Sequence, residues 1–279
     1  MTFERLWRVC LCAGAILAAA PCAAQDAGIP ADQHPWGRFP VGSWKSVRVT
    51  THTLDAGGNV AGATTTEIRT TVVAADRASY SLRVQSSVEI AGKVFQAQPQ
   101  VVKHGYYGQP AGASVAVERR GQQELVIDGR TVSSDVHLVS FQSDEGKRTS
   151  TIHYSSQVAP HQLRRETTTD GGAETERSRT LVETVALEMP HQVLGQWKPA
   201  AHLKTTRTSP QGTKVTIEVH CDDVPGGVVS HVATESDPVG RVVRRSALEL
   251  IDYGIGGHAP AADPAARRRL FQRHRMRRM

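Results

Sequence analysis

The densest group of side chains that could do chemistry is His220-Cys221-Asp222-Asp223, with His231 a little further along. Imidazole and carboxylate groups are common general acids and bases, and with a thiolate they are also zinc ligands. Successive residues of a strand point to opposite faces, so His220 and Asp222 share one face. Cys221 and Asp223 share the other. We therefore expect no metal site and interpret the group as a polar turn, with a hydrolase built from His220, Asp222, Asp223 and His231 as the alternative.

Cys221 is the only cysteine after residue 24. It alternates in phase with Val215, Ile217 and Val219, which predicts that all four side chains lie on one buried apolar face. A cysteine in such a place is a small hydrophobe and not a reactive thiol. Since no internal disulfide can form in the exported chain, the hydrophobic core must stabilise it. We therefore expect Ile217→Ala to lower the free energy of unfolding by roughly 2–4 kcal/mol.

The familiar motifs of enzymes are missing from the sequence. It contains no Gly-x-Ser-x-Gly, no Ser-x-x-Lys, no His-Glu-x-x-His, no phosphate-binding loop and no Cys-x-x-Cys. The glycines fall in turns between strand-like segments, not before helices, so nucleotide binding has no support. We expect no cofactor.

An internal repeat is predicted around two stretches, residues 151–167 and 216–235. Each runs a strand-like segment into a polar cluster, then Val and Pro, then a second strand-like segment. Pro160 and Pro225 are 65 residues apart, as are His137 and His202. Proline lacks the donor that a central strand needs, so matched prolines predict two equivalent corners between strands. We interpret His137 and His202 as structural histidines, and Trp44-Lys45 and Trp197-Lys198 as a further, weaker echo.

Period-two alternation and tight turns extend over most of the chain. Turn signals such as Asp55-Ala56-Gly57-Gly58-Asn59 and Asp128-Gly129 recur about every 8 to 15 residues, which is typical of short antiparallel strands. The sequence predicts an all-β fold of ten to fourteen antiparallel strands with internal repeats, arranged as a curved sheet or half-open barrel.

The chain divides into five segments. Residues 1–24 carry Arg5 and Arg8, an uncharged run and a small-residue cleavage pattern, which predicts an export signal. A lipid-modified Cys22 is a less favoured alternative because Pro21 precedes it. Residues 25–43 form a proline-rich aromatic arm, which we expect to be extended. Residues 44–123 form a first β unit, which ends in a long connection at 103–123. Residues 124–257 form a second β unit that contains both hinges, and residues 258–279 form a basic tail.

Two short segments and the general layout resemble known proteins. The segments DVPGGVV and LELIDYG are similar to pieces of uncharacterised exported bacterial proteins. The layout of long hairpins crossed by a Val-Pro hinge resembles the LolA-like lipoprotein carriers. That resemblance implies a half-open barrel with a greasy concave face, although the chain shows no counterpart to their helical lid.

Basic residues gather at the carboxyl end. The whole chain has a formal net charge of +6, and the tail accounts for it, since it has one acid, Asp263, and seven arginines: Arg267, Arg268, Arg269, Arg273, Arg275, Arg277 and Arg278. Two interpretations of this tail stay open: attachment to an anionic membrane or polymer surface, and a disordered, solvated tail that has no partner. Export argues against nucleic acid as the biological partner.

These observations favour a non-enzymatic protein, periplasmic or secreted, that binds an apolar ligand or another envelope component. A pocket lined by Val, Leu, Ile and Trp would favour the apolar ligand. A His and an Asp within about 3 Å of each other on a cleft floor would favour the hydrolase.

Overall fold

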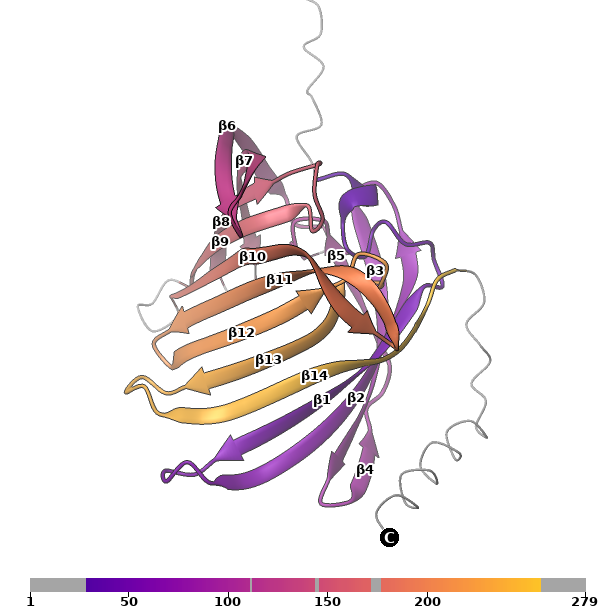
Figure 1. Ribbon diagram of the computed structural model, residues 1–279, viewed down its shortest axis with the longest axis vertical. Coiled ribbons are helices and arrows are strands. Elements are labelled where there is room, and N and C mark those ends of the chain that lie inside the picture. The colour runs from indigo at the N-terminus through magenta and orange to yellow at the C-terminus, as the bar shows by residue number, and fades with distance from the viewer. Residues whose placement is uncertain (1–28, 111, 144–145, 172–176, 257–279) are drawn as a thin grey trace, which may run out of the picture.

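The computed structural model describes residues 29–110, 112–143, 146–171 and 177–256 (Figure 1). The predicted export signal and the basic tail lie outside the described residues. Within the described ranges no helix is long and apolar enough to cross a membrane. The described residues form one short 3₁₀ helix, η1 (Ala31–Gln33), and fourteen strands: β1 (Trp44–Leu54), β2 (Val60–Ala75), β3 (Ser79–Ile90), β4 (Lys93–Gln96), β5 (Gln100–Gly105), β6 (Val115–Ile127), β7 (Arg130–Ser143), β8 (Gly146–Tyr154), β9 (Gln162–Asp170), β10 (Ser178–Val193), β11 (Gln196–Ser209), β12 (Gly212–His220), β13 (Val228–Ser236) and β14 (Val242–Gly254).

All fourteen strands belong to one antiparallel sheet. Its order is β4-β3-β2-β1-β14-β13-β12-β11-β10-β9-β8-β7-β6, and β5 pairs with β3 beside β4. Paired strands are consecutive in sequence except in two cases: β3 pairs with β5 as well as with β4, and β1 pairs with β14, which joins the first strand to the last. The consecutive strands β4 and β5, and β5 and β6, are not paired with each other. The all-β antiparallel prediction is therefore confirmed, and strands of both expected β units share this sheet.

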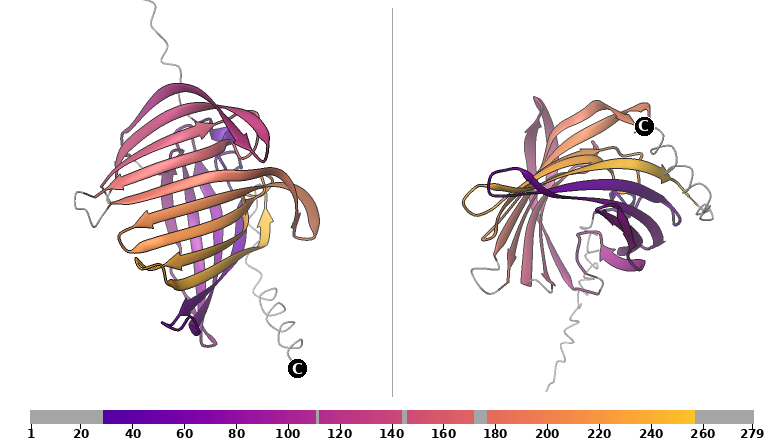
Figure 2. Two further views of the ribbon diagram at one scale, coloured as in Figure 1. Left: turned by 60° about the vertical axis from the view of Figure 1, so that its left-hand side comes forward. Right: turned by 90° about the horizontal axis from the view of Figure 1, so that it is seen from below.

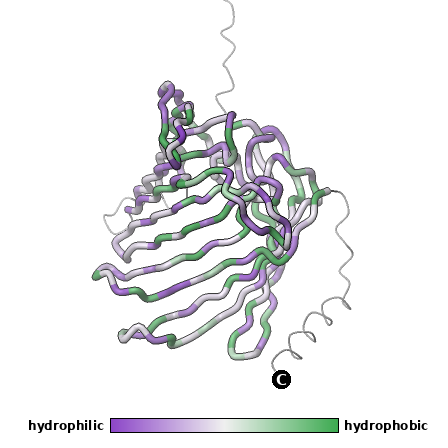
Figure 3. Tube along the Cα trace, in the orientation of Figure 1, coloured by the Kyte–Doolittle hydropathy of each residue, from purple (hydrophilic) through white to green (hydrophobic). Residues whose placement is uncertain are grey.

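The sheet is strongly curved and open (Figure 1). In the left view of Figure 2, the strands β1–β3 cross behind the broad wall made by β7–β13, so the two ends of the sheet face each other. One free edge of the sheet is β6, and the other is formed by β4 and β5, which both pair with β3. The predicted curved sheet is thus confirmed, and Figure 3 shows hydrophilic and hydrophobic residues alternating along its strands.

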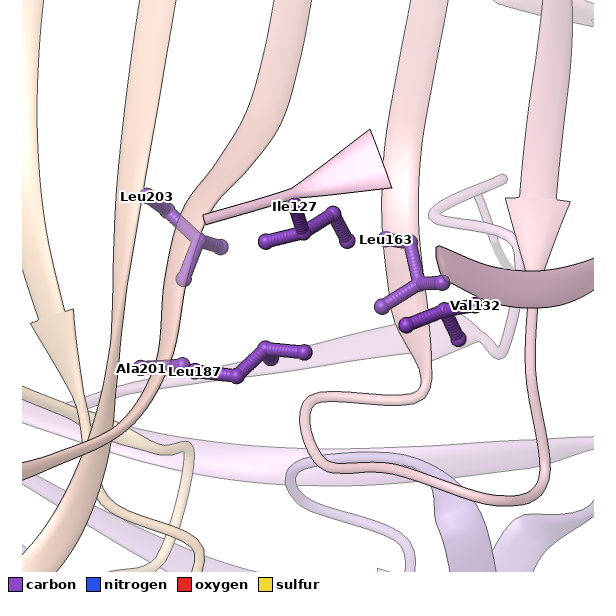
Figure 4. Close-up of a cluster of buried hydrophobic side chains, with 6 residues drawn as sticks. All are labelled: Ile127, Val132, Leu163, Leu187, Ala201 and Leu203. Carbon is purple, nitrogen blue, oxygen red and sulfur yellow. The ribbon is translucent and has the colours of Figure 1, made fainter. Parts of the chain in front are cut away.

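The hydrophobic core lies on the concave side in several separate clusters. The largest joins β6, β7, β9, β10 and β11 (Figure 4), and its buried members are Ile127, Val132, Leu163, Leu187, Ala201 and Leu203. A second cluster joins β7 and β8 through Val139, Phe141, Ile152 and Tyr154. Because long strands bend over the concave side, apolar burial is divided among patches that leave polar residues between them.

The predicted buried face of β12 is wrong. Thr216 is buried, whereas Ile217 is 37% exposed on the outer face, where its cross-strand partner Val232 is 60% exposed. Cys221 is buried, as expected, but it lies in the corner after β12 and packs with Val224 there. The burial phase of the strand is therefore the opposite of the prediction.

Strand boundaries recur in two successive groups, β6–β9 and β10–β13. β7 and β11 each have 14 residues and begin 66 positions apart, at 130 and 196. β8, β9, β12 and β13 each have 9 residues, and the connections 155–161 and 221–227 are of equal length. In each connection the first residue's N–H donates to the last residue's carbonyl, at 2.8 Å in one and 2.9 Å in the other.

These matched corners hold Pro160 and Pro225, as expected of equivalent strand-corner-strand units. The strands, however, correspond at an offset of 66, so the two prolines are one position out of step. His137 and His202 are out of step in the same way. Whether the two groups arose by sequence repetition stays a prediction.

The matched pairs Trp44-Lys45 and Trp197-Lys198 and the aromatic arm at 25–43 differ from expectation. Trp44 is buried and Trp197 is 73% exposed, so they do not occupy equivalent places. The aromatic arm is not extended, since it contains η1 and a series of turns over residues 31–42. The expected connection at 103–123 contains the end of β5 and much of β6, which crosses the expected unit boundary.

Candidate functional site

Four ionisable side chains from β1, β12 and β13 gather on the concave side: Lys45, Glu218, His220 and His231. We call this group the inner ion cluster. Cross-strand partners share a face of a sheet, and Leu203, Glu218 and His231 form one row across β11, β12 and β13. Leu203 is buried in the core, so its row faces inward. His220 is in phase with Glu218 and faces the same way.

Hydrogen bonds fix the geometry of the inner ion cluster. Nε2 of His220 lies 2.9 Å from Oε2 of Glu218. The Lys45 ammonium donates to the backbone carbonyl of Val228, the first residue of β13, at 3.0 Å. β1 and β13 are not sheet neighbours, because β14 lies between them. Lys45 therefore ties two strands together across the concave side.

Burial and mutual charge shift the pKa values in this cluster. Burial lowers the pKa of Lys45 to about 8, although attraction to Glu218 acts the other way. Burial alone would raise the pKa of Glu218, but the hydrogen bond with His220 and the nearby charges of His231 and Lys45 hold it below its usual value. Burial lowers the pKa of His231, against the pull of Glu218. The cluster is thus a set of coupled acids and bases in a poorly hydrated place.

The aromatic arm closes one side of the cluster. The Trp36 ring centroid lies 5.4 Å from the Lys45 ammonium, within the range of a cation–π contact. The Gly226 N–H donates to the Pro35 carbonyl at 2.8 Å, so the arm is also bound to the second corner. Gly226 has a φ of 74°, and a Cβ there would come within 2.4 Å of Trp36. Only glycine fits this junction without a shift.

The two aspartates of the predicted acid–base set lie outside the cluster. Asp222 pairs with Arg38 of the arm. Asp223 pairs with the Lys198 ammonium at 2.7 Å. The structure therefore brings His220 and His231 to one carboxylate, Glu218, and places Asp222 and Asp223 in surface ion pairs. Sequence analysis missed Glu218, although its period-two spacing from His220 was a usable signal.

A trough continues from the cluster along the concave side, with His231 belonging to both. It is a cavity of about 470 Å³ lined from β1, β2, β12, β13 and β14 by Val49, Thr51, Thr53, Thr64, Lys214, His231, Ala233, Glu235, Arg244 and Ser246. We call it the inner trough. Within it Arg244 donates to Glu235 at 3.3 Å. Only Val49 and Ala233 are apolar, so the expected greasy lining is not found at this place.

The other predicted residues take structural places. His137 and His202 lie on opposite faces of the sheet, since the row of His137 contains the buried Ile152 and the row of His202 contains Val219, in phase with the exposed Ile217. The Cys221 thiol is buried, and burial raises its pKa, which opposes thiolate chemistry. In the described ranges no group of three or more His, Cys, Asp or Glu side chains could hold a metal ion.

Comparisons with known proteins found remote structural neighbours and no family match. No family model and no curated protein matches the chain. A candidate lipoprotein from Parabacteroides distasonis ATCC 8503 is similar with 11% identity, a TM-score of 0.33, and coverage of 77% of this chain and 97% of that one. A candidate exported protein with a YmcC-like fold from Bacteroides fragilis NCTC 9343 has 9% identity, a TM-score of 0.28 and coverage of 77% and 99%. Likenesses at these scores carry no argument about function here.

Proposed function

We propose that the protein is an exported, non-enzymatic β scaffold that binds a polar, hydrogen-bonding envelope component in the inner trough. The observation that supports this most directly is the lining of the trough. Lys214, Glu235 and Arg244 supply charges of both signs, and Thr51 and Ser246 are among its hydroxyl groups. Export itself is supported by the amino-terminal sequence pattern.

The polarity of the trough favours one of the two expected ligand classes over the other. An apolar ligand would have to strip water from charged and hydroxyl groups without replacing their hydrogen bonds, which costs free energy for each group. A ligand with several hydroxyl or anionic groups would instead satisfy Lys214, Arg244 and the threonines. These few fixed polar groups would orient the ligand in the trough, as polar groups do in most binding sites.

Titration calorimetry with defined compounds tests this proposal. Lipopolysaccharide and soluble peptidoglycan fragments serve as polar envelope compounds, and N-phenyl-1-naphthylamine serves as an uncharged apolar one. We expect saturable binding of a polar compound that weakens roughly tenfold in Arg244→Gln, as loss of one charge-assisted hydrogen bond implies.

Arg245→Gln is the matched control, because Arg245 is the next residue of β14 and its row lies on the outer face. Binding of a polar compound should be equal in this variant and in the wild type. Saturable binding of the naphthylamine alone, unaffected by Arg244→Gln, would overturn the proposal in favour of an apolar ligand.

The inner ion cluster keeps a hydrolase as the second candidate. The expected signature was a His and an Asp within about 3 Å, and the structure has His220 and Glu218 at 2.9 Å instead. An ester such as p-nitrophenyl acetate tests it. Turnover above background that falls at least roughly tenfold in Glu218→Gln, and not in Asp222→Asn, would establish the cluster as an acid–base site.

A further inference from the structure

The tip of the β10–β11 hairpin exposes large apolar side chains. Figure 2 shows this hairpin projecting from the body on the side where β14 ends. Val193, at the end of β10, is buried with Cys221, Val224 and Val229 and anchors the hairpin to the second corner. Just beyond this anchor, Leu194 is 48% exposed and Trp197 is 73% exposed. The hairpin is thus held in place at its base and presents a leucine and a tryptophan to the outside.

The turn itself is unusual for its residue type. Leu194 and Gly195 have φ of 46° and 85°, and the corresponding turn of the β6–β7 hairpin has Asp128 and Gly129 at 48° and 76°. Aspartate is a common residue at such a turn, whereas a leucine at positive φ is strained and gains nothing from water. The two turns therefore have the same backbone shape, but the β10–β11 turn has an exposed apolar residue at the position of positive φ where the β6–β7 turn has an aspartate. Strain of this kind is a reason to look for function.

The last strand, β14, ends close to the anchored base of this hairpin. Tyr253, near the end of β14, packs against the cluster that contains Val193. The sequence after β14 carries the seven arginines between 267 and 278. The last described strand therefore ends beside the anchored base of the apolar tip. An exposed leucine and tryptophan, in a chain whose sequence after β14 is rich in arginine, match the two parts of an anionic bilayer surface, its interface and its head groups.

We propose that the β10–β11 hairpin tip inserts into the interfacial layer of an anionic lipid bilayer, with Trp197 and Leu194 as the inserted side chains. Tryptophan suits this layer because its ring is apolar and its indole N–H still finds a polar partner there. The inference is independent of what the inner trough binds. It adds a structured contact to the expected attachment of the basic tail.

Brominated lipids test the insertion, because they quench tryptophan fluorescence only at short range. The chain from residue 25 to 279 is mixed with vesicles of phosphatidylcholine and phosphatidylglycerol in equal parts, with and without bromine on the acyl chains. We expect quenching that Trp197→Phe abolishes, since Trp44 is buried in the body and Trp36 is held against Lys45 and Gly226 at the inner ion cluster. We also expect vesicle affinity to fall roughly tenfold in Leu194→Asn, which removes apolar area while asparagine tolerates the positive φ.

Val126→Asn is the matched control, because Val126 is 74% exposed at the tip of the β6–β7 hairpin. It should leave vesicle affinity unchanged, and thermal unfolding should show that all variants are folded. Vesicle binding without quenching of Trp197 would mean that the tail binds alone and would overturn the proposal. So would equal losses in Leu194→Asn and Val126→Asn, or an absence of binding by the unmodified chain.

Discussion

Lys45 is the residue whose removal tests the electrostatics of the inner ion cluster most directly. Its side chain is buried, and burial lowers its pKa from 10.5 to about 8. Each pKa unit corresponds to about 1.36 kcal/mol, so holding the ammonium charged in the folded state costs roughly 3 kcal/mol. Lys45→Met keeps most of the volume and removes this cost. It also loses the hydrogen bond to Val228, worth roughly 1 kcal/mol.

The sign of the pH dependence follows from the lowered pKa. Below pH 8 both the folded and the unfolded chain hold the proton, so the folded wild type carries the whole cost. Between pH 8 and 10.5 the folded chain releases the proton and the unfolded chain keeps it, so the free energy of unfolding of the wild type rises with pH. At pH 7 we therefore expect Lys45→Met to be more stable than the wild type by roughly 2 kcal/mol, and this advantage should disappear toward pH 10.

Urea unfolding followed by circular dichroism at several pH values between 7 and 10 measures this difference. Burial raises the pKa values of Tyr80 and Tyr154 to about 12, and these tyrosines are present in both proteins, so their titration cancels in the comparison. A difference between variant and wild type that stays constant over this range would refute the reasoning. A constant difference would mean that Lys45 is hydrated in solution and does not belong to a desolvated cluster.

Two further substitutions test the packing. Because Ile217 lies on the outer face, Ile217→Ala should lower the free energy of unfolding by less than about 1 kcal/mol, whereas Ile152→Ala, at a fully buried position, should cost roughly 2–5 kcal/mol in the same urea titration. Gly226→Ala should cost at least about 1 kcal/mol more than Gly58→Ala in thermal unfolding, since both glycines have positive φ but only the first would push a Cβ against Trp36. Equal costs in either pair would contradict the structure.

The strands could be predicted from the sequence because their signals are local. Alternation over a few residues and turns such as Asp128-Gly129 define where strands begin and end without any information about distant parts of the chain. The curvature was expected from the resemblance of the long-hairpin layout to the half-open barrels of the LolA-like carriers. These predictions did not depend on knowing what each face of the sheet packs against.

The orientation of β12 could not be predicted in the same way. Val215, Ile217 and Val219 alternate with Thr216 and Glu218, and the usual rule assigns the apolar set to the core. Here the inner face of β12 adjoins a polar trough and not a second apolar layer. The apolar set therefore lies on the outer face, and the rule assigns each side chain of β12 to the wrong face. Lys45 was missed for another reason, since its contact to Val228 spans 183 residues and leaves no local signal.

The predicted repeat shows how sensitive a strand pattern is to one residue. Matching prolines and histidines gave an offset of 65, whereas the strand boundaries correspond at 66. In a period-two structure a slip of one residue moves every side chain to the other face. His137 and His202 therefore lie on opposite faces although they match in sequence, and the inward residue that corresponds to His137 is Leu203.

The offset of 66 also shows that polar side chains recur on the concave side in both strand groups. It relates His231 of β13 to Arg165 of β9, whose side chain donates to the Tyr107 carbonyl at 2.9 Å and to the Ser150 hydroxyl at 3.2 Å. Burial and the charge of Arg148 lower the pKa of Arg165 to about 10. Desolvated bases cost stability, and a concave face that only had to be filled would hold leucine or valine at both positions. Arg165 and His231 occupy the same inward position in the groups β6–β9 and β10–β13. Two costly bases at this position favour the interpretation that the concave side is kept polar, as the binding of a polar ligand requires.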